Sequence, residues 1–114
     1  MSSYCPRRGD VVWLTLDPQA GHEQSGHRPA LVLSPESYNR KTGLAILCPV
    51  SSRVKDYPFE VVIPEGLKVS GAILSDHVKS LDWEARHVKF FCHVPPSVVA
   101  EVMNKLETLL SPVD

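Results

Sequence analysis

Short apolar runs alternate with polar segments along residues 1–94, and glycine or proline marks most of the changes. Runs of β-branched and aromatic residues that are bounded by such turn signals predict strands. Strands are expected over residues 11–16, 29–34, 44–50, 59–63, 72–75, 77–81 and 87–94. The run PALVLS at 29–34 is nearly all apolar, so we expect this strand to be buried on both faces.

The pattern changes after residue 94. Apolar side chains then recur with i, i+3, i+4, i+7 spacing, which is typical of one face of a helix. They are Val99, Val102, Met103, Leu106, Leu109 and Leu110. Two prolines and Ser97 open the segment and Pro112 ends it, so an amphipathic helix is predicted over 95–112.

Two shorter helical segments are also expected. Residues 35–43 form a turn or one short helix that Gly43 would end, and residues 82–85 a single helical turn. Strands followed by a helix indicate the α+β class. The predicted architecture is a compact β-barrel, with the C-terminal amphipathic helix over one side or one end of the sheet.

The composition is that of an ordinary globular protein. The chain has 114 residues, enough for one domain over 1–114, with 43% hydrophobic and 22% charged residues. No apolar run is long enough to span a membrane, and the N-terminal MSSYCPRRGD lacks a signal-peptide core, so a cytoplasmic location is expected. The net charge of −1 excludes a broad phosphate-coating surface, so any contact with nucleic acid must be local.

The three cysteines indicate neither a disulfide framework nor a zinc site. Cys5, Cys48 and Cys92 are widely spaced, odd in number and form no CxxC pair. We expect reduced, structural thiols.

A polar loop over 17–28 concentrates side chains that can do chemistry. It carries His22, Glu23, Gln24, His27 and Arg28 within seven positions. A solvated connecting loop is the simplest interpretation, but loops of more than about 12 residues inside compact domains are commonly functional. The spacing of its histidines matches no recognised metal-ligand pattern, and there is no GxSxG elbow, so neither a metal, a cofactor nor a serine hydrolase is expected.

A second polar loop follows the strand predicted at 44–50. Ser51, Ser52, Arg53 and Lys55 supply hydroxyls and cations there. This loop is either a solvated hairpin turn or the partner of the first loop at one rim of the barrel. In the second case a carboxylate, a guanidinium, hydroxyls and a lysine would meet, a set that suits a phosphodiester because arginine pairs with two phosphate oxygens.

Several motifs, taken in order, resemble one known family. They are GDVVWLTLDPQAGHEQSGHRPALVLSP, YNRKTG, CPVSS, KDYPFEV, SDHVKS and the W-x-AR of Trp83 to Arg86. The chain resembles the MazF/PemK family of toxin–antitoxin ribonucleases over nearly its whole length, and looks closest to the MazF branch.

The resemblance implies both a fold and an activity. The family fold is a small SH3-like β-barrel, shared with gyrase-poison toxins, with short helices and one at the C-terminus, usually in a homodimer. Members are sequence-specific, metal-independent endoribonucleases that cut single-stranded RNA, mostly mRNA, leaving 2′,3′-cyclic phosphate and 5′-hydroxyl ends. A cognate antitoxin inhibits them by laying an acidic, disordered tail over the RNA groove.

The resemblance also implies catalytic residues. By position, Glu23 and Arg28 match the family's catalytic glutamate and arginine. Ser52 stands where many members have a catalytic threonine, a departure that keeps the hydroxyl. His77 stands where a glutamine is common, so the RNA sequence preference is expected to differ.

The PemK branch assigns part of the chemistry elsewhere. Its aspartate and histidine match Asp76 and His22, but the arginine that it uses two positions before the aspartate is Leu74 here. This departure favours the scheme that uses Glu23 and Arg28.

Other residues are expected to contact RNA along the groove, and one of two histidines to act as the general acid. The residues expected to bind substrate are His22, Gln24, His27, Ser51, Lys55, Asp76 and His77. Either His22 or His27 could protonate the leaving oxygen, since histidine titrates near neutral pH. Trp13 is interpreted as core or dimer interface more readily than as an RNA contact, and Trp83 as packing.

Two other functions remain open from the sequence. A non-catalytic module on the same fold would bind a protein, as the gyrase poisons do, and would not need Glu23, Arg28 and Ser52 together. A metal-dependent nuclease is the third possibility.

Overall fold

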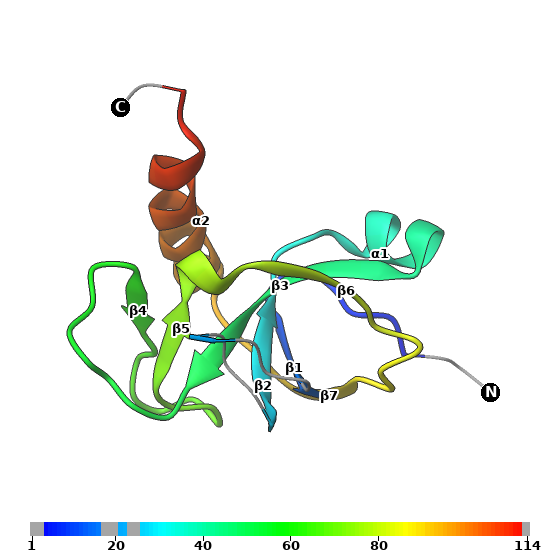
Figure 1. Ribbon diagram of the computed structural model, residues 1–114. Helices are drawn as coiled ribbons and strands as arrows, with labels where there is room; N and C mark the ends of the chain where they lie inside the picture. Colours follow the sequence, from blue (N-terminus) through cyan, green and yellow to red (C-terminus); the bar gives the residue numbers. More distant parts are fainter. Residues whose placement is uncertain (1–3, 17–20, 23–25, 113–114) are drawn as a thin grey trace.

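The computed structural model describes residues 4–16, 21–22 and 26–112. Its elements follow the order strand, strand, helix, five further strands with a 3-10 turn among them, and a last helix (Figure 1). They are β1 (Asp10–Thr15), β2 (His27–Val32), α1 (Glu36–Thr42), β3 (Leu44–Ser51), β4 (Glu60–Val62), β5 (Ala72–Leu74), η1 (Ser75–His77), β6 (Lys79–Asp82), β7 (Lys89–His93) and α2 (Pro96–Leu110). The α+β prediction is therefore confirmed.

The described strands form one antiparallel sheet in the order β4-β5-β3-β2-β1-β7. Besides β2, strand β3 pairs with two other strands. Its residues Leu44–Leu47 pair with β6, and Val50 and Ser51 pair with β5. No pairing between β4 and β7 closes the sheet within the described residues. The predicted barrel is thus a strongly bent, open sheet.

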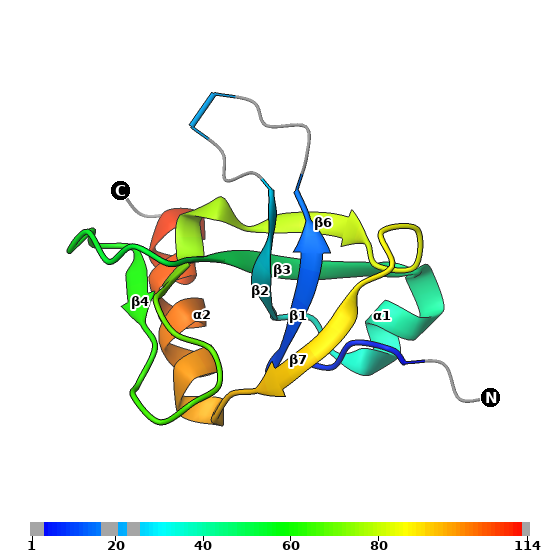
Figure 2. The ribbon, with the colours of Figure 1, turned by 90° about the horizontal axis from the view of Figure 1, so that it is seen from below.

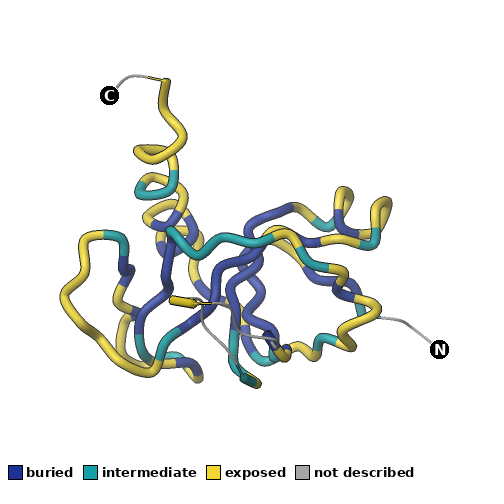
Figure 3. The backbone as a smooth tube through the Cα atoms, viewed as in Figure 1, coloured by how far each residue is buried: buried dark blue, intermediate teal, exposed yellow. Residues whose placement is uncertain are grey.

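The core lies on both faces of β2, as its apolar run predicts. Leu31 and Leu33 belong to a cluster with Val50 and the buried side of α2. Ala30 and Val32 belong to a second cluster with Leu14, Leu47 and Trp83. Figure 3 shows buried positions concentrated where β1, β2 and β3 lie together. Alternate side chains of one strand therefore fill two cores.

The C-terminal helix covers the sheet with only part of its apolar face. Val98, Val99 and Val102 are buried, but Met103 is 42%, Leu109 48% and Leu110 71% exposed. The helix is predicted correctly; the burial of its last turns is not, because α2 extends beyond the sheet (Figure 1). Figure 2 shows α1 and α2 at opposite ends of the sheet.

The strands predicted at 72–75 and 77–81, on either side of Asp76, need correction. Ser75, Asp76 and His77 form the 3-10 turn η1 instead, because the chain must leave β5 and cross to the other half of β3. The predicted helical turn at 82–85 agrees with the structure, where the N–H of Arg86 donates to the carbonyl of Asp82 at 3.1 Å. Helix α1 ends at Gly43, whose φ of 76° suits glycine, as predicted.

A buried asparagine fixes α1 to the rest of the protein. Asn39 is fully buried, and its Nδ2 donates to the carbonyls of Pro6 (2.9 Å) and Ser34 (3.1 Å). Its Oδ1 accepts from Ser34 Oγ at 2.5 Å, and its backbone carbonyl accepts from Trp83 Nε1 at 2.9 Å. Trp83 is thereby a packing residue, as its sequence context predicts.

Replacing Asn39 by alanine is expected to lower the free energy of unfolding by about 2–3 kcal/mol, since the variant leaves buried polar partners without a hydrogen bond. Urea denaturation measures the change. Asn104→Ala, at an exposed position of α2, is the matched control and should change stability by less than about 0.5 kcal/mol. Equal stabilities of the two variants would show that the Asn39 network contributes nothing.

Candidate active site

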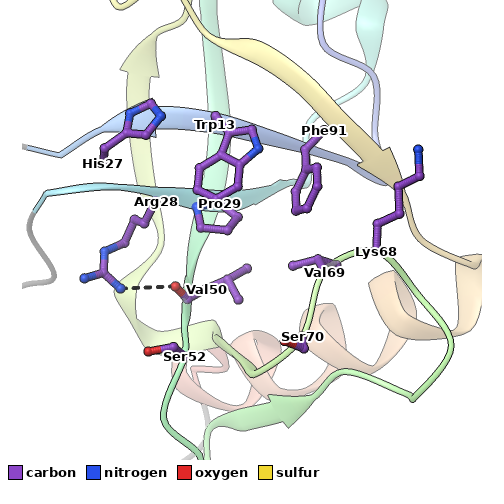
Figure 4. Close-up of a pocket in the computed structure, with 10 residues that line it drawn as sticks. All are labelled: Trp13, His27, Arg28, Pro29, Val50, Ser52, Lys68, Val69, Ser70 and Phe91. Atoms are coloured by element: carbon purple, nitrogen blue, oxygen red, sulfur yellow. Dashed lines mark hydrogen bonds between the residues drawn. The ribbon is translucent and has the colours of Figure 1, made fainter.

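A cavity of about 360 Å³ opens between the ends of β2 and β3 and the loop that precedes β5 (Figure 4). Aromatic, cationic and hydroxyl side chains line it together. The lining residues are Trp13, His27, Arg28, Pro29, Val50, Ser52, Lys68, Val69, Ser70 and Phe91. Such a mixture can hold both a planar group and a phosphate.

Arg28 and Ser52 line this cavity together although they come from different elements. Arg28 lies on β2 and not in the predicted loop over 17–28, because β2 begins at His27, which pairs with Thr15 of β1. Arg28 is half-buried on β2, and its Nη1 donates to the carbonyl of Val50 at 3.2 Å. That bond ties the guanidinium to the last residues of β3, directly before Ser52, which is exposed. Figure 4 shows both side chains toward one end of the cavity and Lys68 toward the other. The two residues predicted to be catalytic therefore line one cavity.

Aromatic rings form one wall of the same cavity. The rings of Trp13 and His27 are stacked, with centroids 5.3 Å apart and planes inclined by 10°. The ring centroid of Phe91 lies 5.0 Å from that of Trp13, and the two planes are inclined by 40°. His27 Nδ1 lies 3.3 Å from Thr15 Oγ1, so Nε2 is the nitrogen left to face a substrate. Trp13, interpreted from the sequence as core or dimer interface, is half-buried and lines the cavity beside His27.

A glycine allows the loop before β5 to approach the end of β3. A Cβ on Gly71 would lie 2.1 Å from the carbonyl oxygen of Ser51, and its φ is 112°. Any side chain there would push the loop away. The approach brings Lys68 and Ser70 to the cavity opposite Arg28.

A second cavity of about 430 Å³ lies beside the first. It is lined by His22, Ser51, Lys55, Asp56, Tyr57, Pro58, Glu60, Leu74 and His77. A third, shallower hollow of about 310 Å³ shares His22 and His77 with it and adds Asp76, Val78 and Lys79. His22 from the first loop thus faces residues of the second loop, which agrees with the prediction that the two loops meet.

A tyrosine–aspartate pair connects the second cavity with the hollow. The Tyr57 hydroxyl donates to Asp76 Oδ2 at 2.5 Å, and this hydrogen bond is the main reason why the pKa of Tyr57 is raised. The other oxygen of Asp76 is buried and has no partner in the described part of the chain.

The structure thus sorts the predicted residues into neighbouring groups. Arg28, Ser52 and His27 line the first cavity. Ser51, Lys55, His22 and His77 line the second, and Asp76 lies in the adjoining hollow. Glu23 and Gln24 lie outside the described residues. Leu74, in place of the arginine of the PemK branch, is buried in β5 and borders the second cavity.

Several lining residues are not indicated by the sequence, among them Lys68, Ser70, Phe91 and Tyr57. Lys68, Ser70 and Phe91 come from segments that carry no recognisable motif, and only the fold brings them to the cavity. Tyr57 belongs to the motif KDYPFEV, which by itself indicates no role for the tyrosine. The polar residues before Tyr57 and the proline after it indicate a turn, and a tyrosine on such a turn is expected to be exposed.

The residues that the structure describes contain neither a metal-binding cluster nor a membrane-spanning helix. No group of three or more histidine, cysteine, aspartate or glutamate side chains is placed to hold a metal ion. No helix there is both long and apolar enough to cross a membrane. The three cysteines are buried and unpaired with one another.

Comparison with protein families gives one match over most of the chain. Residues 7–110 match the sequence model described as "PemK-like, MazF-like toxin of type II toxin-antitoxin system". The endoribonuclease toxin MazF of Escherichia coli K12 is 43% identical over 110 residues, which cover 96% of this chain and 98% of the relative. The endoribonuclease PemK of Escherichia coli is 35% identical, with 91% of this chain and 81% of the relative covered.

Solved structures of MazF also superpose closely on this chain. The crystal structure of MazF from Deinococcus radiodurans superposes with a TM-score of 0.91 at 56% identity and covers 95% of this chain and 98% of its own. MazF in a MazE–MazF complex from the same organism superposes with a TM-score of 0.86, again at 56% identity, with coverage of 95% and 97%.

Proposed function

Because the chain belongs to the PemK-like, MazF-like toxins of type II toxin–antitoxin systems, we propose that it is an endoribonuclease toxin that cuts single-stranded RNA at specific sequences. Its target would be mostly mRNA, and no metal would be needed. The MazF and PemK relatives are named endoribonucleases, which supports this activity.

One observation carries the proposal. Arg28 on β2 and Ser52 directly after β3 line the same cavity, and the carbonyl of Val50 accepts a hydrogen bond that holds the guanidinium beside the end of β3. A guanidinium and a hydroxyl that converge are suited to the non-bridging oxygens of a phosphodiester. A module that only bound a protein would have no need of this convergence.

The proposed reaction uses the nucleophile that RNA itself carries. The 2′-oxygen attacks the adjacent phosphorus, the bond from phosphorus to the 5′-oxygen breaks, and a 2′,3′-cyclic phosphate and a 5′-hydroxyl remain. Glu23 takes the proton from the 2′-hydroxyl as general base. Arg28 stabilises the charge that develops on the phosphorane, and Ser52 donates a hydrogen bond to one of its oxygens.

The geometry favours His27 as the general acid. His27 lines the cavity of Arg28 and Ser52, whereas His22 lines the second cavity. The stack on Trp13 and the contact between Nδ1 and Thr15 orient the imidazole. Nε2 is then the atom that gives a proton to the leaving 5′-oxygen.

The proposed partners follow from the relatives. MazF of Deinococcus radiodurans has been crystallised together with MazE. We propose that a cognate antitoxin inhibits this chain as well, by laying an acidic, disordered segment over the cavity that Arg28 and Lys68 line, and that the toxin is a homodimer. The 1–114 chain would act as a single toxin domain.

Incubation with a long single-stranded RNA in EDTA, followed by mapping of the cut ends, tests the proposed function. Discrete cuts at one recurring sequence are expected. Intact RNA with and without added Mg²⁺ would favour the protein-binding alternative, and cuts that appear only with added metal would favour a metal-dependent nuclease.

Replacing Ser52 by alanine is expected to slow cleavage about 10-fold, because one hydrogen bond to a charged oxygen is lost. Ser52→Thr keeps the hydroxyl, so its rate should stay within about threefold of the unmodified protein. Single-turnover cleavage of one mapped RNA oligonucleotide measures both. If the alanine and threonine variants are equally active, the hydroxyl of residue 52 has no part in the reaction.

A further inference from the structure

The end of β3 separates the first cavity, which Arg28 lines, from the second, which Tyr57 lines. Consecutive side chains of an extended strand point to opposite sides. Ser52 accordingly lines the cavity of Arg28, while Ser51 lines the cavity of Tyr57. An RNA strand whose scissile phosphate lies at Arg28 and Ser52 would therefore have a neighbouring nucleotide beside the Tyr57 cavity.

We propose that the Tyr57 cavity is a base-binding subsite in which the ring of Tyr57 stacks on the base of a nucleotide next to the cut. This inference rests on the proposed function, since it concerns the same RNA. It assigns Tyr57 as a residue for substrate affinity and sequence preference, distinct from the groups that perform the reaction.

The charges of the cavity favour a base over a second phosphate. Lys55 contributes a cation and Asp56 an anion, and Ser51 adds a hydroxyl. A carboxylate repels a phosphate, whereas donors and acceptors together match the edge of a base. Unpaired, splayed bases are what proteins recognise in single-stranded RNA.

Tyr57 presents its ring and not its hydroxyl. The side chain is 43% exposed, and its hydroxyl is engaged by Asp76 Oδ2. The ring of Phe59 lies 5.7 Å away at 60° and supports it from one side. A ring fixed in this way can stack with little loss of side-chain entropy on binding.

The loop that carries Tyr57 is held in place before any RNA binds. Glu60 is buried, and its carboxylate accepts from the backbone N–H of Lys55 (3.1 Å) and of Tyr57 (3.0 Å). Lys105 of α2 donates to the carbonyls of Pro58 (2.7 Å) and Glu60 (3.0 Å). Tethers from both sides thus fix an exposed aromatic residue at the mouth of a cavity.

The test compares Tyr57→Leu, Tyr57→Phe and the control Tyr38→Leu, at an exposed tyrosine on α1 that is 37% accessible. With a mapped RNA oligonucleotide, Tyr57→Leu is expected to raise KM about 10-fold and to change kcat less than about threefold, because stacking on an aromatic ring accounts for that much affinity. Tyr57→Phe keeps the ring and should stay within about threefold in KM. Tyr38→Leu should match the unmodified protein.

Substrates that lack one base locate the subsite. Two oligonucleotides are made, one abasic on each side of the cut. For one of them the unmodified protein should lose affinity, and Tyr57→Leu should then add no further loss, since the ring has nothing left to stack on. Unchanged KM in Tyr57→Leu, or losses that simply multiply for both substrates, would overturn the inference while cleavage by the unmodified protein upholds the proposed function. An unmodified protein that cuts no RNA would overturn both.

Discussion

Cleavage of single-stranded RNA is expected to slow by about 10²–10³-fold when Arg28 is replaced by alanine. The guanidinium is almost always charged and lies at the cavity where the phosphorane would form. Loss of one donor that stabilises a developing charge costs rate in this range. Single-turnover cleavage of a mapped oligonucleotide at saturating protein measures the effect on the chemical step.

Two companion variants show whether the loss belongs to the guanidinium. Arg28→Lys should recover only part of the rate, because an ammonium lacks the planar fork that pairs with two oxygens. Arg40→Ala, on α1 and paired there with Glu36, should cleave at the normal rate. A fully active Arg28→Ala protein would remove this residue from the mechanism.

Replacing Glu23 by glutamine is expected to reduce the rate by about 10²–10⁴-fold, since general-base catalysis contributes to that extent. Glutamine keeps the size and hydrogen-bonding capacity of the side chain but accepts no proton at neutral pH. The measurement is a profile of single-turnover rate against pH. The unmodified protein should lose rate toward acidic pH as its general base becomes protonated, and the variant should lack this acidic limb.

Glu101→Gln, at an exposed position of α2, is the control for a carboxylate removed elsewhere, and it should leave both rate and profile unchanged. If Glu23→Gln keeps the rate and the acidic limb of the unmodified protein, another group takes the proton.

The sequence predicts the strands of this fold well because each is bounded by turn residues. The apolar run at 29–34 indicates a strand buried on both faces, and Leu31 and Val32 do lie in different core clusters. Periodicity cannot show which strands pair at the edges. The predicted closure into a barrel therefore gave way to an open sheet, in which β3 divides its length between β5 and β6.

The spacing of apolar residues reveals that a helix forms, but not where its support ends. Val99 and Leu109 belong to the same predicted face, yet the first is buried and the second is 48% exposed. Val98, Val99 and Val102 pack in the core beside the sheet, whereas the last turn of α2 extends beyond the sheet, so one pattern meets different surroundings along the helix.

The candidate site also has residues that the sequence predicts and residues that only the fold reveals. Arg28 and Ser52 can be predicted because each lies in a polar stretch of sequence next to an apolar run and matches a catalytic position of the family that the chain resembles, and the structure brings them to one cavity. Lys68 and Tyr57 cannot, because their roles depend on how separate loops are folded back. Gly71 lets one loop touch the end of β3, and Glu60 fixes the other from within.

The central claim is that this chain cuts RNA through the 2′-hydroxyl next to the scissile phosphate. The direct measurement uses one mapped oligonucleotide and a copy with a single 2′-deoxy nucleotide on the 5′ side of the cut, both in EDTA. We predict that only the all-RNA strand is cut and that its ends are a 2′,3′-cyclic phosphate and a 5′-hydroxyl. Cleavage of the 2′-deoxy strand at the same bond, or a 5′-phosphate on the product, would contradict the account.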